Sequence, residues 1–181
     1  MMDVPATTKH YRVPPWLGVA IAVVGYGFVD VAAPIVVASF AHRWGWNGLR
    51  PGVANLIGVP LIVAGVAVIL LAGRVHRAAQ RRRDGLVVTF DRQHLMTPNY
   101  LVTDGVYRHT RNPLYVADFA MWAGWAIFLG SVPVAIGLGI LVTGLRLGVR
   151  VEERGLRHQF GDEWRRYAAA TPRFFRLRRA R

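Results

Sequence analysis

Apolar residues along the chain fall into four long runs separated by polar segments. The runs cover residues 14–41, 52–73, 113–130 and 132–148. Each is near or above the ~17 to 25 residues with which a helix crosses the hydrocarbon core of a bilayer. The last two runs meet at Gly130-Ser131, so we expect them to form a tight helical hairpin. The pattern predicts an all-α integral membrane protein with about four transmembrane helices in one membrane domain, residues 1–181.

The polar segment between the second and third runs, residues 74–112, has the features of an ordered cap. It begins with a basic extension of the second helix and continues into the extended-looking stretch LVVTF, residues 86–90. Turn-forming pairs follow at Pro98-Asn99 and Asp104-Gly105. This composition favours a folded cap over a linker.

The second polar segment, residues 149–181, contains an amphipathic helix. Its large apolar side chains are spaced by four, four and three residues, which places them on one helical face: Leu156, Phe160, Trp164 and Tyr167. We expect this face to lie on the bilayer surface or on the cap. Gly161, followed by two acidic residues, is expected to divide the helix in two.

Basic residues are distributed unevenly among these segments. Of the 23 Lys and Arg residues, eight lie in 74–112 and eleven from Arg146 onward, whereas the hairpin turn has none. By the positive-inside rule, both termini and the cap are cytoplasmic, and the protein is placed in the plasma (inner) membrane. The net charge of +13 is then explained by topology and by attraction to anionic lipid headgroups, to which the terminal RFFRLRRAR is suited. Nucleic acid is not expected as a partner.

Two other features of the sequence narrow the class of protein. The chain has no Cys and its six His residues lack metal-ligand spacing, so no metal site is expected. A cleaved signal peptide is a competing interpretation of the first run, because Lys9 and Arg12 precede it. That run, however, is roughly twice the length of the ~7 to 15 residue core of a signal peptide.

Two polar clusters meet the membrane on the same predicted side. RHTRNPLY (108–115) leads into the third helix, and RVEE (150–153) leaves the fourth. The hairpin places these helix ends side by side, so their charged and aromatic side chains can share a pocket: Arg111, Asn112, Tyr115, Arg146, Arg150, Glu152 and Glu153. Carboxylates, arginines and an aromatic ring suit a ligand that carries both charges.

Each member of this set also has a plain structural explanation. Asn112 and Pro113 suit the N-cap and first position of a helix. Tyr115 suits the aromatic belt of a membrane protein. Glu152 and Glu153 can form helical ion pairs with neighbouring arginines. The combination of these groups at one membrane edge is what favours a site.

Within these segments, GVYRHTRNPLY resembles the motif G-P-Y-R-x-x-R-[HN]-P-x-Y, and EERGLRHQFGDEWRRY followed by TPR resembles E-E-x-x-L-x-x-x-F-G-x-E-[YW]-x-x-Y with V-P-R. Together they are similar to the isoprenylcysteine carboxyl methyltransferase family in its short bacterial form, whose C-terminal pattern is shared with phospholipid amine methyltransferases. The resemblance covers residues 86–175. It departs from the motif at Val106 and Ala117, neither of which removes a charged or hydrogen-bonding group.

The resemblance implies methyl transfer from S-adenosylmethionine to a lipophilic or lipid acceptor at the cytoplasmic membrane edge. A carboxylate is the first expectation for the acceptor group, with an amine or a thiol as alternatives. By similarity, Arg111 and Arg146 are candidates for orienting the acceptor. The implied cofactor contacts are Leu101, Val102, Gly105, Tyr107, Asn112, Tyr115, Glu152 and Glu153.

Two other classes of protein are compatible with the sequence. One is a non-catalytic membrane module that binds lipid or acts as a scaffold. The other is a membrane reductase with a similar C-terminal half and a nicotinamide cofactor. Asp30 and Asp118 lie within apolar runs, where a carboxylate is costly. Each carboxylate is expected either to form a structural hydrogen bond within the protein or to line a path for the methyl acceptor.

Overall fold

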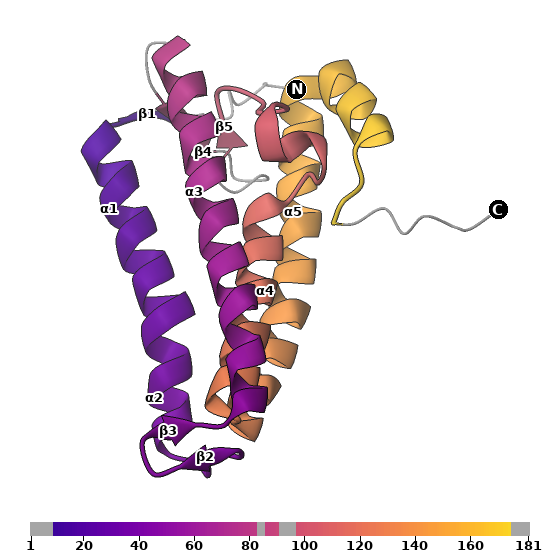
Figure 1. Cartoon of the computed structure of the whole chain (residues 1–181). Helices are drawn as coiled ribbons and strands as arrows, with labels where there is room; N and C mark the ends of the chain where they lie inside the picture. The colour runs from indigo at the N-terminus through magenta and orange to yellow at the C-terminus, as the bar shows by residue number, and fades with distance from the viewer. Residues whose placement is uncertain (1–8, 83–85, 91–96, 175–181) are drawn as a thin grey trace, which may run out of the picture.

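The computed structural model describes residues 9–82, 86–90 and 97–174, and it shows a bundle of long helices with short strands at both ends (Figure 1). The first half of the described chain contains β1 (Lys9–Val13), α1 (Pro15–Tyr26), the π-helix η1 (Gly27–Ala32), α2 (Ala33–Ser39), β2 (Trp46–Asn47), β3 (Arg50–Pro51), the 3-10 helix η2 (Val53–Ile57) and α3 (Gly58–Arg82). The second half contains β4 (Leu86–Phe90), β5 (Thr97–Pro98), the 3-10 helix η3 (Gly105–Arg108), α4 (Pro113–Leu129) and α5 (Val132–Ala170).

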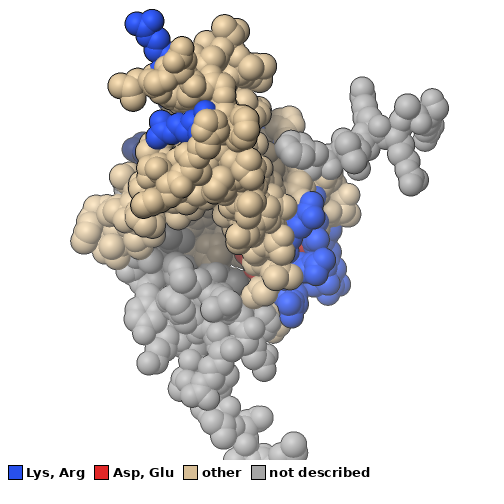
Figure 2. Space-filling model, turned by 90° about the horizontal axis from the view of Figure 1, so that it is seen from below, with Lys and Arg blue, Asp and Glu red and all other residues tan. Residues whose placement is uncertain are grey.

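The helices are long and apolar enough to cross a membrane. In the described residues, three helical stretches meet that description, Trp16–Ser39, Val53–Arg82 and Val132–Ala170, and Pro113–Leu129 is a shorter apolar helix. Large apolar side chains such as Phe28 and Ile140 remain exposed on the outside of the bundle. Viewed from the end that carries β2 and β3, most of the surface is uncharged, and basic side chains gather at places along its edge (Figure 2). The all-α membrane architecture expected from the four runs is therefore confirmed.

The first helical run contains a π-helical segment whose cause lies in the sequence. Pro34 has no N–H with which to bond the carbonyl of Asp30, so the regular pattern of α-helical bonds is interrupted there. Ala33 N donates to Phe28 O instead, as in a π-turn. The free Asp30 carbonyl accepts a 2.6 Å hydrogen bond from Trp125 Nε1 of α4. This bond fixes the middle of the first run against the rest of the bundle.

Glycines allow α3 and α4 to pack closely. A Cβ atom at Gly58 would lie 2.2 Å from Gly124 O, and one at Gly65 would lie 2.9 Å from Ala117 O. Small residues at such contacts let two helix backbones approach, which is the usual basis of helix pairing in membranes. The pair forms the centre of the bundle, and α4 also packs against α5.

The predicted hairpin between α4 and α5 is present. Gly130 adopts the left-handed conformation (φ 57°) that ends α4, and its carbonyl accepts a 2.9 Å hydrogen bond from Trp44 N. Asn55 Nδ2 donates to both Trp44 O and Ile127 O at 3.0 Å. The 42–51 loop and the hairpin turn therefore lie at one end of the bundle, which we call the hairpin end.

The opposite end, which we call the cap end, holds a three-stranded sheet of order β1-β4-β5. LVVTF forms β4, as its pattern predicts, and pairs antiparallel with β1 from Lys9↔Phe90 to Val13↔Leu86. The sheet thus anchors the start of α1 at the cap end. At the other end of the first run, α2 packs against α4 and α5.

α5 continues well past the predicted span into the amphipathic segment. Gly161 interrupts it with φ 49° and ψ −116°, at the residue expected to divide the helix. Beyond this break, Trp164 and Tyr167 are buried, and Tyr167 Oη donates a 2.8 Å hydrogen bond to Tyr107 O of the cap. Of the two placements expected for this face, the structure shows the one on the cap.

Candidate functional site

The loop that leads into α4 is tied to the segment that follows α5. Thr110 Oγ1 and Asn112 Nδ2 each donate a 3.0 Å hydrogen bond to Arg173 O, and Arg111 N donates to Pro172 O at 2.9 Å. Asn112 occupies the N-cap position expected of it, but its side chain makes no capping bond. The N-cap position is therefore confirmed, and the side-chain amide is directed at Arg173 O.

An ion cluster centred on the buried Glu153 carboxylate lies beside these bonds. Glu153 receives Arg111 Nη2 at 3.2 Å and the Arg173 guanidinium on both carboxylate oxygens. Arg111 Nη1 also donates to Ala168 O at 2.9 Å, and its guanidinium lies 5.6 Å from the centre of the Trp164 ring. The hydrogen bonds with Glu153 raise the pKa of Arg173. We call Arg111, Glu153 and Arg173 the clasp, because they join the start of α4, α5 and the following chain.

The neighbouring acid, Glu152, has a different environment. Its Oε2 accepts a 2.8 Å hydrogen bond from Tyr115 Oη of α4, and its side chain is exposed. The helical hairpin brings these two residues, 37 positions apart, to the same edge. The acidic pair is therefore split between two roles. Both carboxylate oxygens of Glu153 are bonded to arginines of the clasp, whereas the carboxylate of Glu152 can accept further hydrogen bonds.

Tyrosines surround Glu152. Tyr26 of α1 is close enough to interact electrostatically with Glu152, Asp118 and Asp30, and Tyr115 interacts in the same way with Asp118 and Tyr26. The polar groups thus extend from the cap end into the apolar part of the bundle. The sequence provided one signal for Tyr26, a hydroxyl within an apolar run, but no pattern connected it with Glu152.

Two acidic side chains lie at the inner end of this series. Asp30 is 1% exposed and Asp118 is 9% exposed, and both belong to the membrane-spanning run of helices. Trp122 interacts with Asp30, but within the described part of the chain Trp122 Nε1 and both Asp Oδ1 atoms lack a hydrogen-bond partner of normal geometry. Asp30 also interacts electrostatically with Asp118. A carboxylate oxygen without a partner is costly at this depth, so Asp30 and Asp118 are candidates for a functional role.

Residues of the cap form one side of the candidate site, next to the tyrosines. Tyr107 is buried, and His76 Nε2 is hydrogen-bonded to Tyr107 Oη at 2.8 Å. Burial, with the nearby Glu152 carboxylate as a smaller cause, raises the pKa of Tyr107 well above its usual value. Gly105 has φ +59°, and a Cβ there would lie 2.6 Å from Val75 Cγ2, so glycine is required at this turn. His76 and Arg173 had no signal as site residues in the sequence beyond their positions in the basic extension and the TPR motif.

A pocket of about 320 Å³ adjoins the cap wall. Leu101 and Val102, two of the predicted cofactor contacts, line it together with the end of α3 and Tyr100. Burial raises the pKa of Tyr100, so its ring presents a neutral hydroxyl. Its lining combines apolar side chains with polar and charged ones, among them Arg82, Asp104 and Glu163, so it offers a ring both apolar contact and hydrogen-bonding groups.

The predicted arginines differ in where they lie. Arg111 is engaged in the clasp, whereas Arg146 and Arg150 are exposed on α5. Arg108 pairs with Asp104 at 2.9 Å on the surface. The proposal that Arg146 orients the acceptor stays a prediction.

Most of RFFRLRRAR, residues 175–181, lies outside the described residues, and its interaction with lipid headgroups also stays a prediction.

Fold and site together define a membrane protein with a polar, partly buried site where its helices meet a cap. The sequence profile of the phospholipid methyltransferase family (PEMT) matches residues 53–163, which is more than half of the chain, and the protein belongs to this family. The match runs from η2 through α3, the cap and α4 to the break in α5. A search of curated proteins gives no significant match. Family membership implies a methyltransferase activity on lipid-related substrates.

Proposed function

We propose that the protein transfers a methyl group from S-adenosylmethionine to the amine of a membrane lipid. The observation that carries this proposal is the arrangement of the Tyr115–Glu152 pair at the cap end beside two buried acids, Asp30 and Asp118, each with one carboxylate oxygen that lacks a hydrogen-bond partner among the described residues. The cap end faces the cytoplasm in this proposal, because the basic residues concentrate there and the methyl donor is a cytoplasmic metabolite. The protein resides in the plasma membrane.

The residues at the cap end fit this methyl donor. Its ribose hydroxyls and amino group require a hydrogen-bond acceptor, and Glu152 has carboxylate capacity beyond its bond with Tyr115. The pocket at Leu101 and Val102 suits the adenine ring. Gly105 and Tyr107 follow its wall residue Asp104 in the same cap loop. Glu153 and Asn112 contribute by holding the walls of this site, because their polar groups are already engaged.

The buried acids support an amine as the acceptor, in preference to the carboxylate that ranks first from sequence. A carboxylate acceptor would be repelled by Asp30 and Asp118, whereas an ammonium group would be paired with them. A lipid amine enters the reaction after losing a proton, and Asp118 is a nearby group that can accept it. The two acids would thus favour an ammonium group over a carboxylate as the acceptor, and they would also take its proton.

The reaction is a direct displacement. S-adenosylmethionine, when bound, supplies a methyl group activated by its sulfonium. The lone pair of the amine, freed when Asp118 takes the ammonium proton, would form the new N–C bond. The electrons of the broken C–S bond would stay on sulfur, so that the donor leaves as the neutral thioether S-adenosylhomocysteine. Tyr26, Tyr115 and Glu152 would hold the reacting groups in line at the cap end of the bundle. Such alignment supplies ~7 to 11 kcal/mol of a barrier.

The methyl donor can be tested by titration of the purified full-length protein. Saturable binding of S-adenosylhomocysteine is expected, without binding of NADPH, and tritiated S-adenosylmethionine should label a membrane lipid extract. Absence of S-adenosylhomocysteine binding contradicts the proposal. NADPH binding in its place would assign the protein to membrane reductases, and binding of neither would assign it to non-catalytic membrane modules.

The acceptor can be tested with Asp118→Asn, which keeps the shape of the side chain and removes its charge. We expect KM for a phospholipid with a primary amine headgroup to rise about tenfold, which corresponds to ~1.4 kcal/mol, because one of two counter-charges is lost. Affinity for S-adenosylhomocysteine should be unchanged. Methylation of oleic acid by the wild-type protein, with the amine lipid left unmodified, would contradict the amine assignment.

A further inference from the structure

Four arginines are concentrated at the cap end of α3. Arg74, Arg77 and Arg81 are spaced by three and four residues and therefore form one stripe along the last turns of the helix. Arg82 follows directly. In the parts of the chain that the structure describes, none of the four has an ion-pair or hydrogen-bond partner. Cations this close on a helix repel one another unless an anion lies between them.

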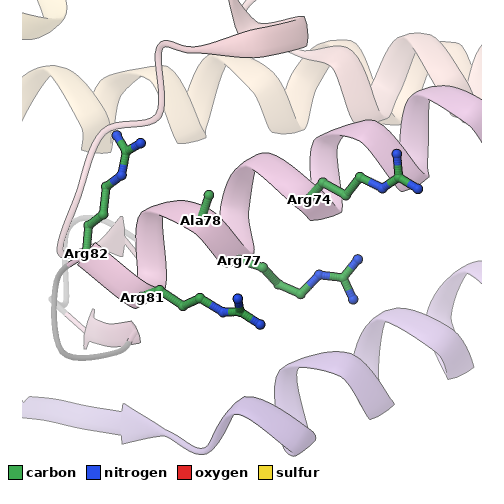
Figure 3. Close-up of a pocket in the computed structure, with 5 residues that line it drawn as sticks. All are labelled: Arg74, Arg77, Ala78, Arg81 and Arg82. Carbon is green, nitrogen blue, oxygen red and sulfur yellow. The ribbon is translucent and has the colours of Figure 1, made fainter.

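The stripe lines a hollow. A pocket of about 400 Å³ is lined by these four arginines and Ala78. Arg77 and Arg81 reach from α3 into the space on the side of α1, Arg74 lies beside them, and Arg82 points to the other side of the helix (Figure 3). All four arginines are exposed, so an anion from the surroundings can reach the hollow that they line. Their arrangement resembles a binding site for one anion.

The depth of the stripe identifies the source of that anion. The apolar part of α3 ends at Gly73, immediately before Arg74, so the first arginine lies where the hydrocarbon region gives way to headgroups. Phosphate is the anionic group found at that depth in a phospholipid bilayer. Arginine binds phosphate oxygens with a planar fork of N–H donors, and the bonds are strengthened by charge.

We propose that Arg74, Arg77 and Arg81 form a specific binding site for the phosphate of a membrane phospholipid, between α3 and the cap end of α1. The site lies outside the groups that bind the methyl donor in the proposed function and does not depend on them. It defines a fixed position for one lipid headgroup at the edge of the helical bundle.

The test compares two lipids that differ by the phosphate alone, dioleoyl phosphatidic acid and dioleoylglycerol. Native mass spectrometry of the full-length protein in detergent is expected to show one tightly bound phosphatidic acid and at least tenfold weaker binding of dioleoylglycerol. The triple variant Arg74→Gln, Arg77→Gln, Arg81→Gln should lose at least tenfold in affinity for phosphatidic acid. Its melting temperature and its affinity for S-adenosylhomocysteine should match those of the wild-type protein.

A matched control is available on α5, where Arg150, Arg154 and Arg157 are exposed and have a similar helical spacing. The corresponding triple Gln variant should retain phosphatidic acid binding. Equal losses in the two triple variants would show general attraction to an anionic lipid and would overturn the site. Displacement of the lipid by submillimolar inorganic phosphate would overturn the lipid as the source. Because lipid binding is measured without a methyl donor, failure of donor binding leaves this test intact.

Discussion

Replacing Glu152 with Gln is expected to weaken the binding of S-adenosylhomocysteine by roughly 10- to 100-fold. The variant keeps the size of the side chain but removes the charge that strengthens its hydrogen bonds to a ribose or an ammonium group, and such bonds contribute about 1.5 to 3 kcal/mol each. Isothermal titration calorimetry of the detergent-solubilised protein measures this directly. The melting temperature should change little, because Glu152 is exposed and Gln can still accept the hydrogen bond from Tyr115.

Two further variants define what the Glu152 result means. Tyr115→Phe removes only the hydroxyl that orients the carboxylate, and a smaller loss of affinity is expected. Asp162→Asn neutralises an exposed acid on the same helix, which is paired with Arg165 at 2.9 Å, and should leave affinity unchanged. If Glu152→Gln binds S-adenosylhomocysteine like the wild-type protein, Glu152 does not contact the donor and the placement of the site is wrong.

Replacing Glu153 with Gln is expected to have its main effect on stability. Arg111 is 13% exposed and Glu153 is 8% exposed, so the variant leaves a nearly buried guanidinium without its counter-charge. Breaking a buried ion pair from one side costs about 3 kcal/mol or more. A large fall in melting temperature should follow, and donor binding should fall because the start of α4 loses its connection to α5.

A double-mutant cycle distinguishes the clasp from simple loss of packing. Arg111→Met removes the guanidinium that Glu153→Gln leaves without a counter-charge. The double variant is therefore expected to lose less free energy of unfolding than the sum of the losses in the two single variants. Additive losses would indicate that the two side chains do not interact as the structure shows. A stable Glu153→Gln protein that fails to bind the donor would reverse the roles assigned here to the two adjacent acids.

Much of the architecture follows from local patterns. The helical runs, the hairpin at Gly130, the strand formed by LVVTF and the break at Gly161 all match their predictions, because each depends on neighbouring residues: apolar length, β-branched content or a positive φ. The π-helix in the first run was not predicted. It depends partly on Pro34, which is visible in the sequence, and partly on Trp125, whose indole satisfies the freed carbonyl from another helix.

Most residues of the candidate site could be predicted from the sequence, but the contacts between them could not. The meeting of Tyr115 with Glu152 follows from the hairpin, and the structure shows it. Arg173 and Tyr26 were missed because their interactions are with other parts of the fold. Arg173 returns from beyond the end of α5 to pair with Glu153, and Tyr26 of α1 interacts electrostatically with Asp118 of α4. No periodicity connects residues that meet only after the helices have packed.

The sequence by itself determined that this is a membrane protein with a polar site at one end of a helical hairpin, because hydropathy and motif spacing are properties of contiguous residues. Only the tertiary structure decided what each member of the acidic pair does. Successive residues on a helix point about 100° apart, so Glu153 turns towards Arg111 and Arg173 while Glu152 turns towards Tyr115. Which of the two becomes buried depends on the packing of α4 and the returning chain against α5, and that packing is set by residues far away in the sequence.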